Sequence, residues 1–202
     1  MELRLPSEYQ EVEYIETSGS AYLTIPYTVV RYDTFDVTAF YNRASGAYVL
    51  FSCGTGNYQV IILIQNRDSL YFKYFATGAA AKITFSNDEL RGKIANYHID
   101  KNGMLTMTIE GETQRYAESK YISDIDGNEK RLFILRRANG ANNFVGRLYK
   151  FVVSNNNAKK LNLVPCYRKS DGEIGMYDTV SKTFYTNAGT GIFLKGADIT
   201  RY

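Results

Sequence analysis

Tryptophan is absent from this 202-residue chain, and only one histidine, two cysteines and three prolines are present. So few His and Cys residues argue against most metal, hydrolytic and redox centres, which need them in clusters. The longest aliphatic run, Val60–Ile64, is far shorter than the roughly 20 residues of a membrane-spanning helix. The N-terminus has no basic stretch followed by an apolar segment, so we expect no secretory signal and no membrane insertion.

The two cysteines, Cys53 and Cys166, lie far apart in apolar, strand-like surroundings. In a chain made in a cytoplasm we expect both to be reduced and buried as small hydrophobic residues, with a structural disulfide as the alternative. Neither has a sequence neighbour that would lower its pKa, which argues against a catalytic thiol.

What is present fits a folded globular chain. Hydrophobic residues make up 45% and charged residues 22%, and the aromatics include 18 Tyr and 11 Phe. This composition excludes an intrinsically disordered chain. The length suits one large β domain, and no linker, low-complexity tract or repeat interrupts it. We therefore predict a single domain over residues 1–202.

Helical periodicity is nearly absent, and period-2 alternation or short apolar runs recur between clusters of Asn, Asp and Gly. One capping-box spacing, Ser86–Glu89, supports a turn or two of helix at most. Strands in such succession predict an all-β, two-sheet antiparallel β-sandwich. The expected strands are Glu11–Thr17, Ala21–Pro26, Thr34–Tyr41, Tyr48–Ser52, Tyr58–Gln65, Ser69–Phe75, Lys82–Phe85, Lys93–Asp100, Met104–Glu110, Thr113–Ala117, Arg131–Arg136, Phe144–Ser154, Lys160–Tyr167, Gly175–Asp178, Thr183–Thr186 and Gly191–Leu194.

Several stretches resemble the concanavalin A-like, laminin-G-like jelly-roll modules of bacteriophage and prophage structural proteins from gut bacteria. The resemblance spans most of the chain, is most specific at its two ends and is weak in the middle. It is carried by Leu5–Glu16, Asn96–Gly103, Ile109–Gly111, Phe144–Phe151, Leu163–Gly172, Gly175–Asp178, Phe184–Asn187 and Gly189–Phe193.

The resemblance implies a concanavalin A-like jelly roll and a non-catalytic, virion-associated role as a decoration, fibre or adhesion protein. The implied partners are other virion proteins, cell-surface glycans and further copies of the chain as a homo-oligomer. The implied location is the virion, assembled in the host cytoplasm. The alternatives are a free-standing, lectin-like carbohydrate-binding module and, from a different class, a glycoside hydrolase, because fold alone does not fix function.

A glycoside hydrolase needs two positioned carboxylates. The nearest pattern is Glu11, Glu13 and Glu16, which matches the Glu-x-Asp-x-x-Glu spacing of laminarinase-like enzymes with Glu in place of Asp. It lies in the first expected strand rather than in mid-chain, so the polar face of an edge strand explains it. The missing tryptophan also removes the usual sugar platform. We therefore predict that the chain is not an enzyme.

Other catalytic and cofactor sites are equally unsupported. His98 falls on the polar side of its expected strand with no catalytic partner nearby in sequence. Asp124 and Asp126 begin like a calcium loop, but the later ligand positions are lacking, so we predict a polar turn and no metal, with calcium as the alternative. The glycines form no phosphate-binding pattern. We expect no cofactor.

The charge is unevenly distributed. Ten of the 24 basic residues and no acid lie between Lys130 and Lys169, leaving 14 basic against 21 acidic residues elsewhere. Three interpretations compete: intramolecular pairing of a basic C-terminal strand with the acidic N-terminal strand, a surface for anionic glycans or proteins, and nucleic-acid binding. With no recognised nucleic-acid module, we predict no nucleic-acid partner. The ligand-binding candidates here are Arg136, Arg137 and Arg147.

Tyrosine rings supply the other candidates. Tyr58, Tyr71 and Tyr74 surround the turn at Asn66–Asp68 and are the candidates for a patch that stacks on sugars or contacts protein. Half-buried structural tyrosines are the favoured interpretation of these rings, and the binding patch is the alternative.

Overall fold

The computed structural model describes residues 5–42, 46–54, 59–65, 69–76, 81–84, 89–111, 113–119, 130–140 and 142–200. Within these ranges the regular structure is all β, and the strands pair antiparallel. The same ranges hold no helix that is long and apolar enough to cross a membrane. The strands are β1 (Tyr9–Glu11), β2 (Ile15–Thr17), β3 (Leu23–Ile25), β4 (Asp33–Tyr41), β5 (Ala47–Cys53), β6 (Gln59–Gln65), β7 (Ser69–Ala76), β8 (Ala81–Thr84), β9 (Ile94–Ile99), β10 (Met104–Ile109), β11 (Thr113–Glu118), β12 (Leu132–Ile134), β13 (Gly146–Asn155), β14 (Ala158–Arg168), β15 (Ile174–Asp178), β16 (Thr183–Thr186) and β17 (Leu194–Lys195).

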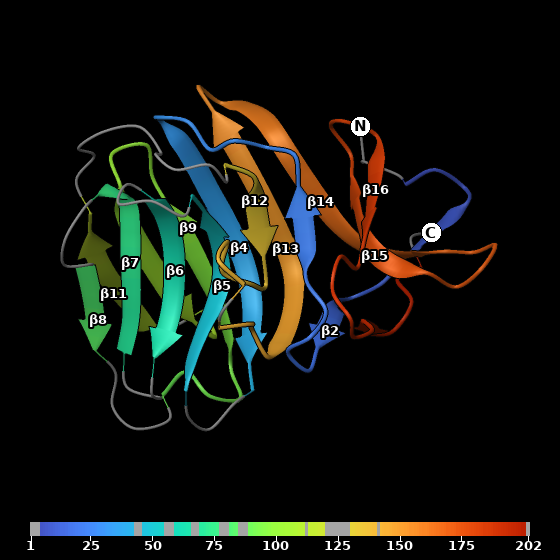
Figure 1. Cartoon of the computed structure of the whole chain (residues 1–202), viewed down its shortest axis with the longest axis horizontal. Coiled ribbons are helices and arrows are strands. Elements are labelled where there is room, and N and C mark those ends of the chain that lie inside the picture. The colour runs from blue at the N-terminus through green and yellow to red at the C-terminus, as the bar shows by residue number, and fades with distance from the viewer. Residues whose placement is uncertain are drawn as a thin grey trace.

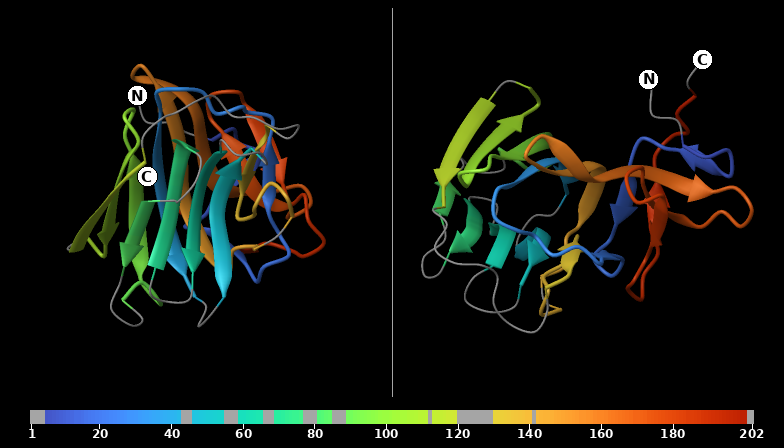
Figure 2. Two further views of the ribbon diagram at one scale, coloured as in Figure 1. Left: turned by 60° about the vertical axis from the view of Figure 1, so that its left-hand side comes forward. Right: turned by 90° about the horizontal axis from the view of Figure 1, so that it is seen from above.

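These strands form two sheets (Figure 1). The larger sheet has the order β11-β10-β9-β4-β13-β14-β15-β16, with β1 on β14, β2 on β13 and β17 on β2. The smaller sheet has the order β3-β12-β5-β6-β7-β8. Figure 2 shows the smaller sheet stacked over one part of the larger, which continues past it through β14, β15 and β16. The prediction of an all-β, two-sheet antiparallel sandwich is confirmed.

Aromatic rings from both sheets meet in the core. Phe35 on β4 and Phe151 on β13 come from the larger sheet, and Phe51 on β5 comes from the smaller. The Phe51 ring centroid lies 5.1 Å from that of Phe35 and 5.2 Å from that of Phe151, and all three side chains are fully buried. Such contacts add to the free energy of burying apolar surface and hold the sheets face to face.

Period-2 alternation sorts side chains between core and solvent as predicted. On β10, Leu105, Met107 and Ile109 are buried, whereas the residues between them are partly exposed. His98 on β9 lies on the outer face, about half exposed, with Nδ1 2.9 Å from Asp36 Oδ1. The prediction of a hydrogen-bonded, solvent-side strand histidine is confirmed.

The N-terminal segment differs from the prediction. The expected strand Glu11–Thr17 divides into β1, which pairs with β14, and β2, which pairs with β13 and β17. Between the two strands the chain changes its pairing partner from β14 to β13 and β17. The local alternation of polar and apolar residues does not reveal such a change. The expected strand Gly191–Leu194 was also wrong, because only Leu194–Lys195 pairs there. The expected helix start at Ser86–Glu89 falls largely outside the described residues.

The acidic start of the chain does lie beside basic C-terminal strands. Glu16 on β2 faces Arg147 on β13, with Arg147 Nε 2.9 Å from Glu16 Oε2. Lys169 Nζ donates to the Ser7 carbonyl at 2.8 Å. The interpretation of the basic segment as pairing with the acidic N-terminal strand is therefore confirmed for Arg147, whereas Lys169 bonds a backbone carbonyl. Cys53 and Cys166 are reduced and buried, as predicted.

Candidate functional site

A cavity of about 330 Å³ opens where the edges of the two sheets meet. Edge strand β3 of the smaller sheet lies against edge strand β16 of the larger sheet. The segment before β3, the loop from β12 to β13 and the loop after β16 all converge on this place. The cavity is lined by Ser20, Tyr22, Arg136, Gly140, Asn143, Ala188, Gly189 and Thr190, and we call it the Arg136 cavity.

The Arg136 guanidinium lies beside an aromatic ring. Its central carbon is 4.2 Å from the centroid of Tyr22, within cation–π range. Gly140, whose backbone has a φ of +85°, also approaches it closely; a Cβ there would lie 2.5 Å from Arg136 Nη2. The N–H groups of a guanidinium have the geometry that binds carboxylates.

Two buried polar atoms in this cavity lack a hydrogen-bond partner among the described residues. They are Arg136 Nε, a donor, and Asn143 Oδ1, an acceptor. The other end of the Asn143 amide is fixed, because Nδ2 donates to the Gly19 carbonyl at 2.6 Å. A buried polar atom without a partner costs about 1–3 kcal/mol, so native proteins rarely leave one without a reason. Both atoms belong to side chains that line the cavity, so unsatisfied polar groups lie directly beneath its surface.

The loop that carries both residues is tied to strand β5. Ser52 Oγ on β5 donates to the Arg136 carbonyl at 3.3 Å and accepts from Ala138 N at 2.8 Å. Asn142, with φ of +56°, accepts from Val49 N at 2.7 Å. These bonds to a buried strand fix the loop backbone from which Arg136 and Asn143 project.

The wall of the cavity formed by the loop after β16 is organised by the side-chain amide of Asn187. Asn187 Oδ1 accepts from Tyr22 N at 3.1 Å and from Gly189 N at 2.7 Å. Its Nδ2 donates to the carbonyls of Gly189 and Gly191. Ala188 N also donates to the Tyr22 carbonyl at 2.9 Å. The turn-forming run Asn187–Gly191 is therefore a ridge pinned to the segment that carries Tyr22.

The cavity is electropositive. Of the described residues that line it, only Arg136 is charged, and an arginine stays protonated across the physiological pH range. The remaining polar lining groups include the hydroxyls of Ser20, Tyr22 and Thr190. Such a surface suits a ligand that carries a negative group and several hydroxyls.

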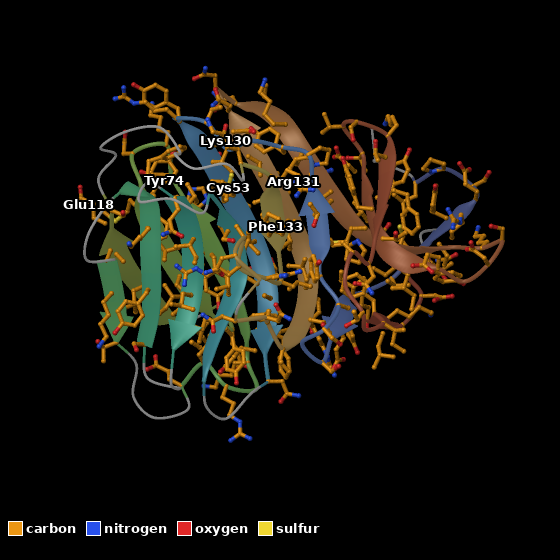
Figure 3. The ribbon with its side chains drawn as sticks, viewed as in Figure 1. Cys53, Tyr74, Glu118, Lys130, Arg131 and Phe133 are labelled. Carbon is orange, nitrogen blue, oxygen red and sulfur yellow. The ribbon has the colours of Figure 1, made fainter. Side chains whose placement is uncertain are left out.

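The two predicted tyrosines within the described residues, Tyr71 and Tyr74, do not form a patch. Tyr58 lies outside the described residues. Tyr71 is partly exposed on β7, with Lys82 Nζ 5.5 Å from its ring centroid. Tyr74, also on β7 and labelled in Figure 3, is fully buried and donates its hydroxyl to the Asp33 carbonyl at 2.9 Å. The prediction of Tyr74 as a surface-binding residue is wrong, because its side of β7 faces the core.

Of the three predicted arginines, Arg147 is separated from the other two. Arg136 lines the cavity, and Arg137 follows it on the same loop, partly exposed. Arg147 lies on β13, paired with Glu16, and its guanidinium carbon is 4.4 Å from the Tyr14 ring centroid and 5.0 Å from that of Phe40. These contacts assign Arg147 to packing of the N-terminal strand.

Sequence reasoning missed Tyr22, Asn143 and the ridge Asn187–Gly191. The Asn-Gly composition of the ridge was visible as a turn signal, and Asn143 lies shortly after Arg136 in sequence. Their convergence depends on how β3, β12 and β16 meet, which no local pattern encodes.

The acidic pattern of the first strand does not line the Arg136 cavity. Glu11 and Glu13 line a separate hollow of about 310 Å³ beside Lys150, and Glu16 is paired with Arg147. Among the described residues no group of three or more His, Cys, Asp or Glu side chains could hold a metal ion. The calcium alternative at Asp124 and Asp126 falls outside the described residues.

No protein-family model and no curated protein matches the sequence. Solved structures match in fold. The CBM40 of the Ruminococcus gnavus IT-sialidase, solved with α2,3 and with α2,6 sialyllactose, has a TM-score of 0.53 at 16% and 17% identity. The match covers 72% of this chain and 90% of that chain.

A putative carbohydrate-binding protein from Bacteroides ovatus ATCC 8483 has a TM-score of 0.57 at 13% identity. That match covers 95% of this chain and 62% of the other. At such identities the likeness shows the fold alone, and it confirms the predicted jelly-roll type of sandwich.

Proposed function

We propose that this chain is a non-catalytic, lectin-like module that binds glycans in the Arg136 cavity. The observation that carries the proposal is a cavity in which the Arg136 guanidinium, 4.2 Å from the Tyr22 ring centroid, lies together with the side chains of Asn143, Ser20 and Thr190. A sugar that carries an acidic group and several hydroxyls matches this combination of a cation, an amide, hydroxyls and an aromatic ring.

The charge of the cavity favours an acidic sugar. A carboxylate accepting from the Arg136 guanidinium forms a charge-assisted hydrogen bond, roughly twice as strong as a neutral one. Among the described residues, no carboxylate that would repel it lines the cavity. Sialyllactose, which is bound in the matched R. gnavus CBM40 structures, is a glycan of this chemical kind and supports the choice.

The fold comparisons favour binding over catalysis and the lectin-like alternative over the virion-associated interpretation. Two matches with TM-scores above 0.5 are described as a carbohydrate-binding module and a putative carbohydrate-binding protein. The roles in a phage particle and in a homo-oligomer stay predictions from the sequence resemblance. An electron-microscopy search for the chain in native particles would test the former.

Binding to a glycan array followed by titration calorimetry tests the proposal. We expect acidic glycans to bind and their neutral counterparts to bind at least tenfold more weakly. Arg136→Gln removes the charge, and Arg136→Lys keeps the charge but loses Nε and the planar edge. Both variants should lower affinity about tenfold or more, as expected for losing a hydrogen bond of 1.5–3 kcal/mol to a charged group.

The matched control is Lys159→Gln. It removes one positive charge from an exposed residue beside the turn of the β13–β14 hairpin, whereas Asn143 of the Arg136 cavity precedes the start of β13. It should bind like the wild type. Equal binding by wild type and both Arg136 variants, with unchanged melting temperatures, would contradict the proposal. So would an array on which acidic glycans give no signal.

A further inference from the structure

A second cavity of about 390 Å³ lies across the ridge from the Arg136 cavity. Ala188, Gly189 and Thr190 face the Arg136 cavity, whereas Asn187 and Gly191 belong to the second one. The two cavities are therefore separated by the thickness of a single loop. The second cavity is lined by Gly172, Glu173, Ile174, Asn187, Gly191, Ile192 and Phe193, and we call it the Ile192 cavity.

The ridge between the cavities is low and rigid. A Cβ on Gly189 would lie 2.0 Å from the Ser20 carbonyl oxygen, and one on Gly191 would lie 2.1 Å from Ser20 Oγ. The loop therefore packs directly on the segment below it, and Asn187 bonds across it. Because a side chain at either glycine would collide with Ser20, the two glycines let the loop lie close to that segment and keep the barrier between the cavities low.

The Ile192 cavity has the opposite chemistry to its neighbour. Glu173 is the one charged residue in its lining as far as the structure describes the chain, and this carboxylate disfavours a second acidic group and accepts hydrogen bonds from hydroxyls. Ile192 is 75% exposed, the most exposed large hydrophobic side chain among the described residues. An exposed aliphatic side chain at a polar rim fits the C–H face of a sugar ring, whose burial removes apolar surface from water.

We infer that the two cavities are adjacent subsites of one glycan site. This inference rests on the proposed function and deepens it. An acidic sugar occupies the Arg136 cavity, and the neutral sugar linked to it crosses the ridge and lies against Ile192. Each cavity is near the lower limit of about 300 Å³ for small-ligand pockets, which suits one sugar ring apiece. The natural ligand class is therefore an acidic oligosaccharide of at least two units.

Titration calorimetry with N-acetylneuraminic acid and with α2,3 sialyllactose tests the inference. The wild type should bind the trisaccharide at least fivefold more tightly than the free acid. Ile192→Ser should remove most of that advantage and leave affinity for the free acid unchanged. The control Val180→Ser alters another exposed aliphatic residue, in the turn after β15 at the end opposite Ile174, and should change neither affinity.

The outcomes separate the two proposals. If both ligands bind equally well to the wild type, or Ile192→Ser leaves the ratio intact, the second subsite is wrong while Arg136-dependent binding upholds the proposed function. If neither ligand binds, the proposed function fails and the inference fails with it.

Discussion

Cys166 on β14 has no accessible surface, and burial raises the pKa of its thiol from 9.0 to about 12. Cys53 on β5 is equally buried and donates from Sγ to the Lys130 carbonyl at 3.0 Å; Figure 3 labels both residues of this pair. Because the thiolate is the reactive form, both cysteines are structural residues in the folded chain.

We predict that neither thiol reacts with Ellman's reagent at pH 8 in the native protein. A pKa of about 12 instead of 9.0 lowers the thiolate fraction of Cys166 roughly a thousandfold at that pH. In guanidinium chloride both thiols should react, giving two equivalents per chain. A fast-reacting equivalent in native protein would show that one cysteine is accessible or activated.

Arg136 is the predicted ligand-binding residue that lines the cavity, and its sequence context gives a physical reason. Its positive charge in an acid-free segment marks it as unable to pair locally, so a contact from elsewhere was expected. Arg147 carried the same signal but met Glu16 across a strand pair. The charge pattern alone does not show which arginine pairs with an acid and which lines a cavity. That depends on the fold, because Arg136 lies in the loop after β12 whereas Arg147 lies on β13 beside β2.

Strands were predictable because alternation is local, and loops were not because their partners are distant. The solvent-exposed face of β10 follows directly from the alternation of polar and apolar residues in Met104–Glu110. The ridge Asn187–Gly191 looks in sequence like an ordinary turn, and it becomes a cavity wall only through hydrogen bonds to Tyr22. The division of Glu11–Thr17 into β1 and β2 is likewise set by neighbours far along the chain.

The ridge offers a prediction of its own. Asn187→Ala removes the side-chain oxygen that accepts hydrogen bonds from Tyr22 N and Gly189 N, and leaves both backbone donors without that partner. We expect a loss of about 1–3 kcal/mol in the free energy of unfolding. Affinity for α2,3 sialyllactose should fall more than tenfold, because the ridge forms part of both cavities.

Urea unfolding and calorimetry measure the two effects of Asn187→Ala separately. Wild-type affinity in a measurably destabilised variant would show that the ridge takes no part in binding. Unchanged stability would show that the Asn187 amide does not pin the loop.

Taken as a whole, the molecule combines a closed sandwich with a sheet extension, and the site lies at their junction. The core aromatics Phe35, Phe51 and Phe151 fix the stacking of the sheets. The extension through β14, β15 and β16 (Figure 1) brings β16 against β3, the edge strand of the smaller sheet, and the loop after β16 against Tyr22. Binding at such a junction needs no deep cleft and no opposed carboxylates, in keeping with a module that holds a glycan without cleaving it.

The location of binding is tested most directly by mapping backbone amide shifts of the labelled protein during titration with N-acetylneuraminic acid. The account predicts that the largest changes occur at Tyr22, Gly140, Asn143 and Gly189 around the Arg136 cavity. Changes centred instead on the outer face of β9 around His98, or no changes at millimolar sugar, would contradict it.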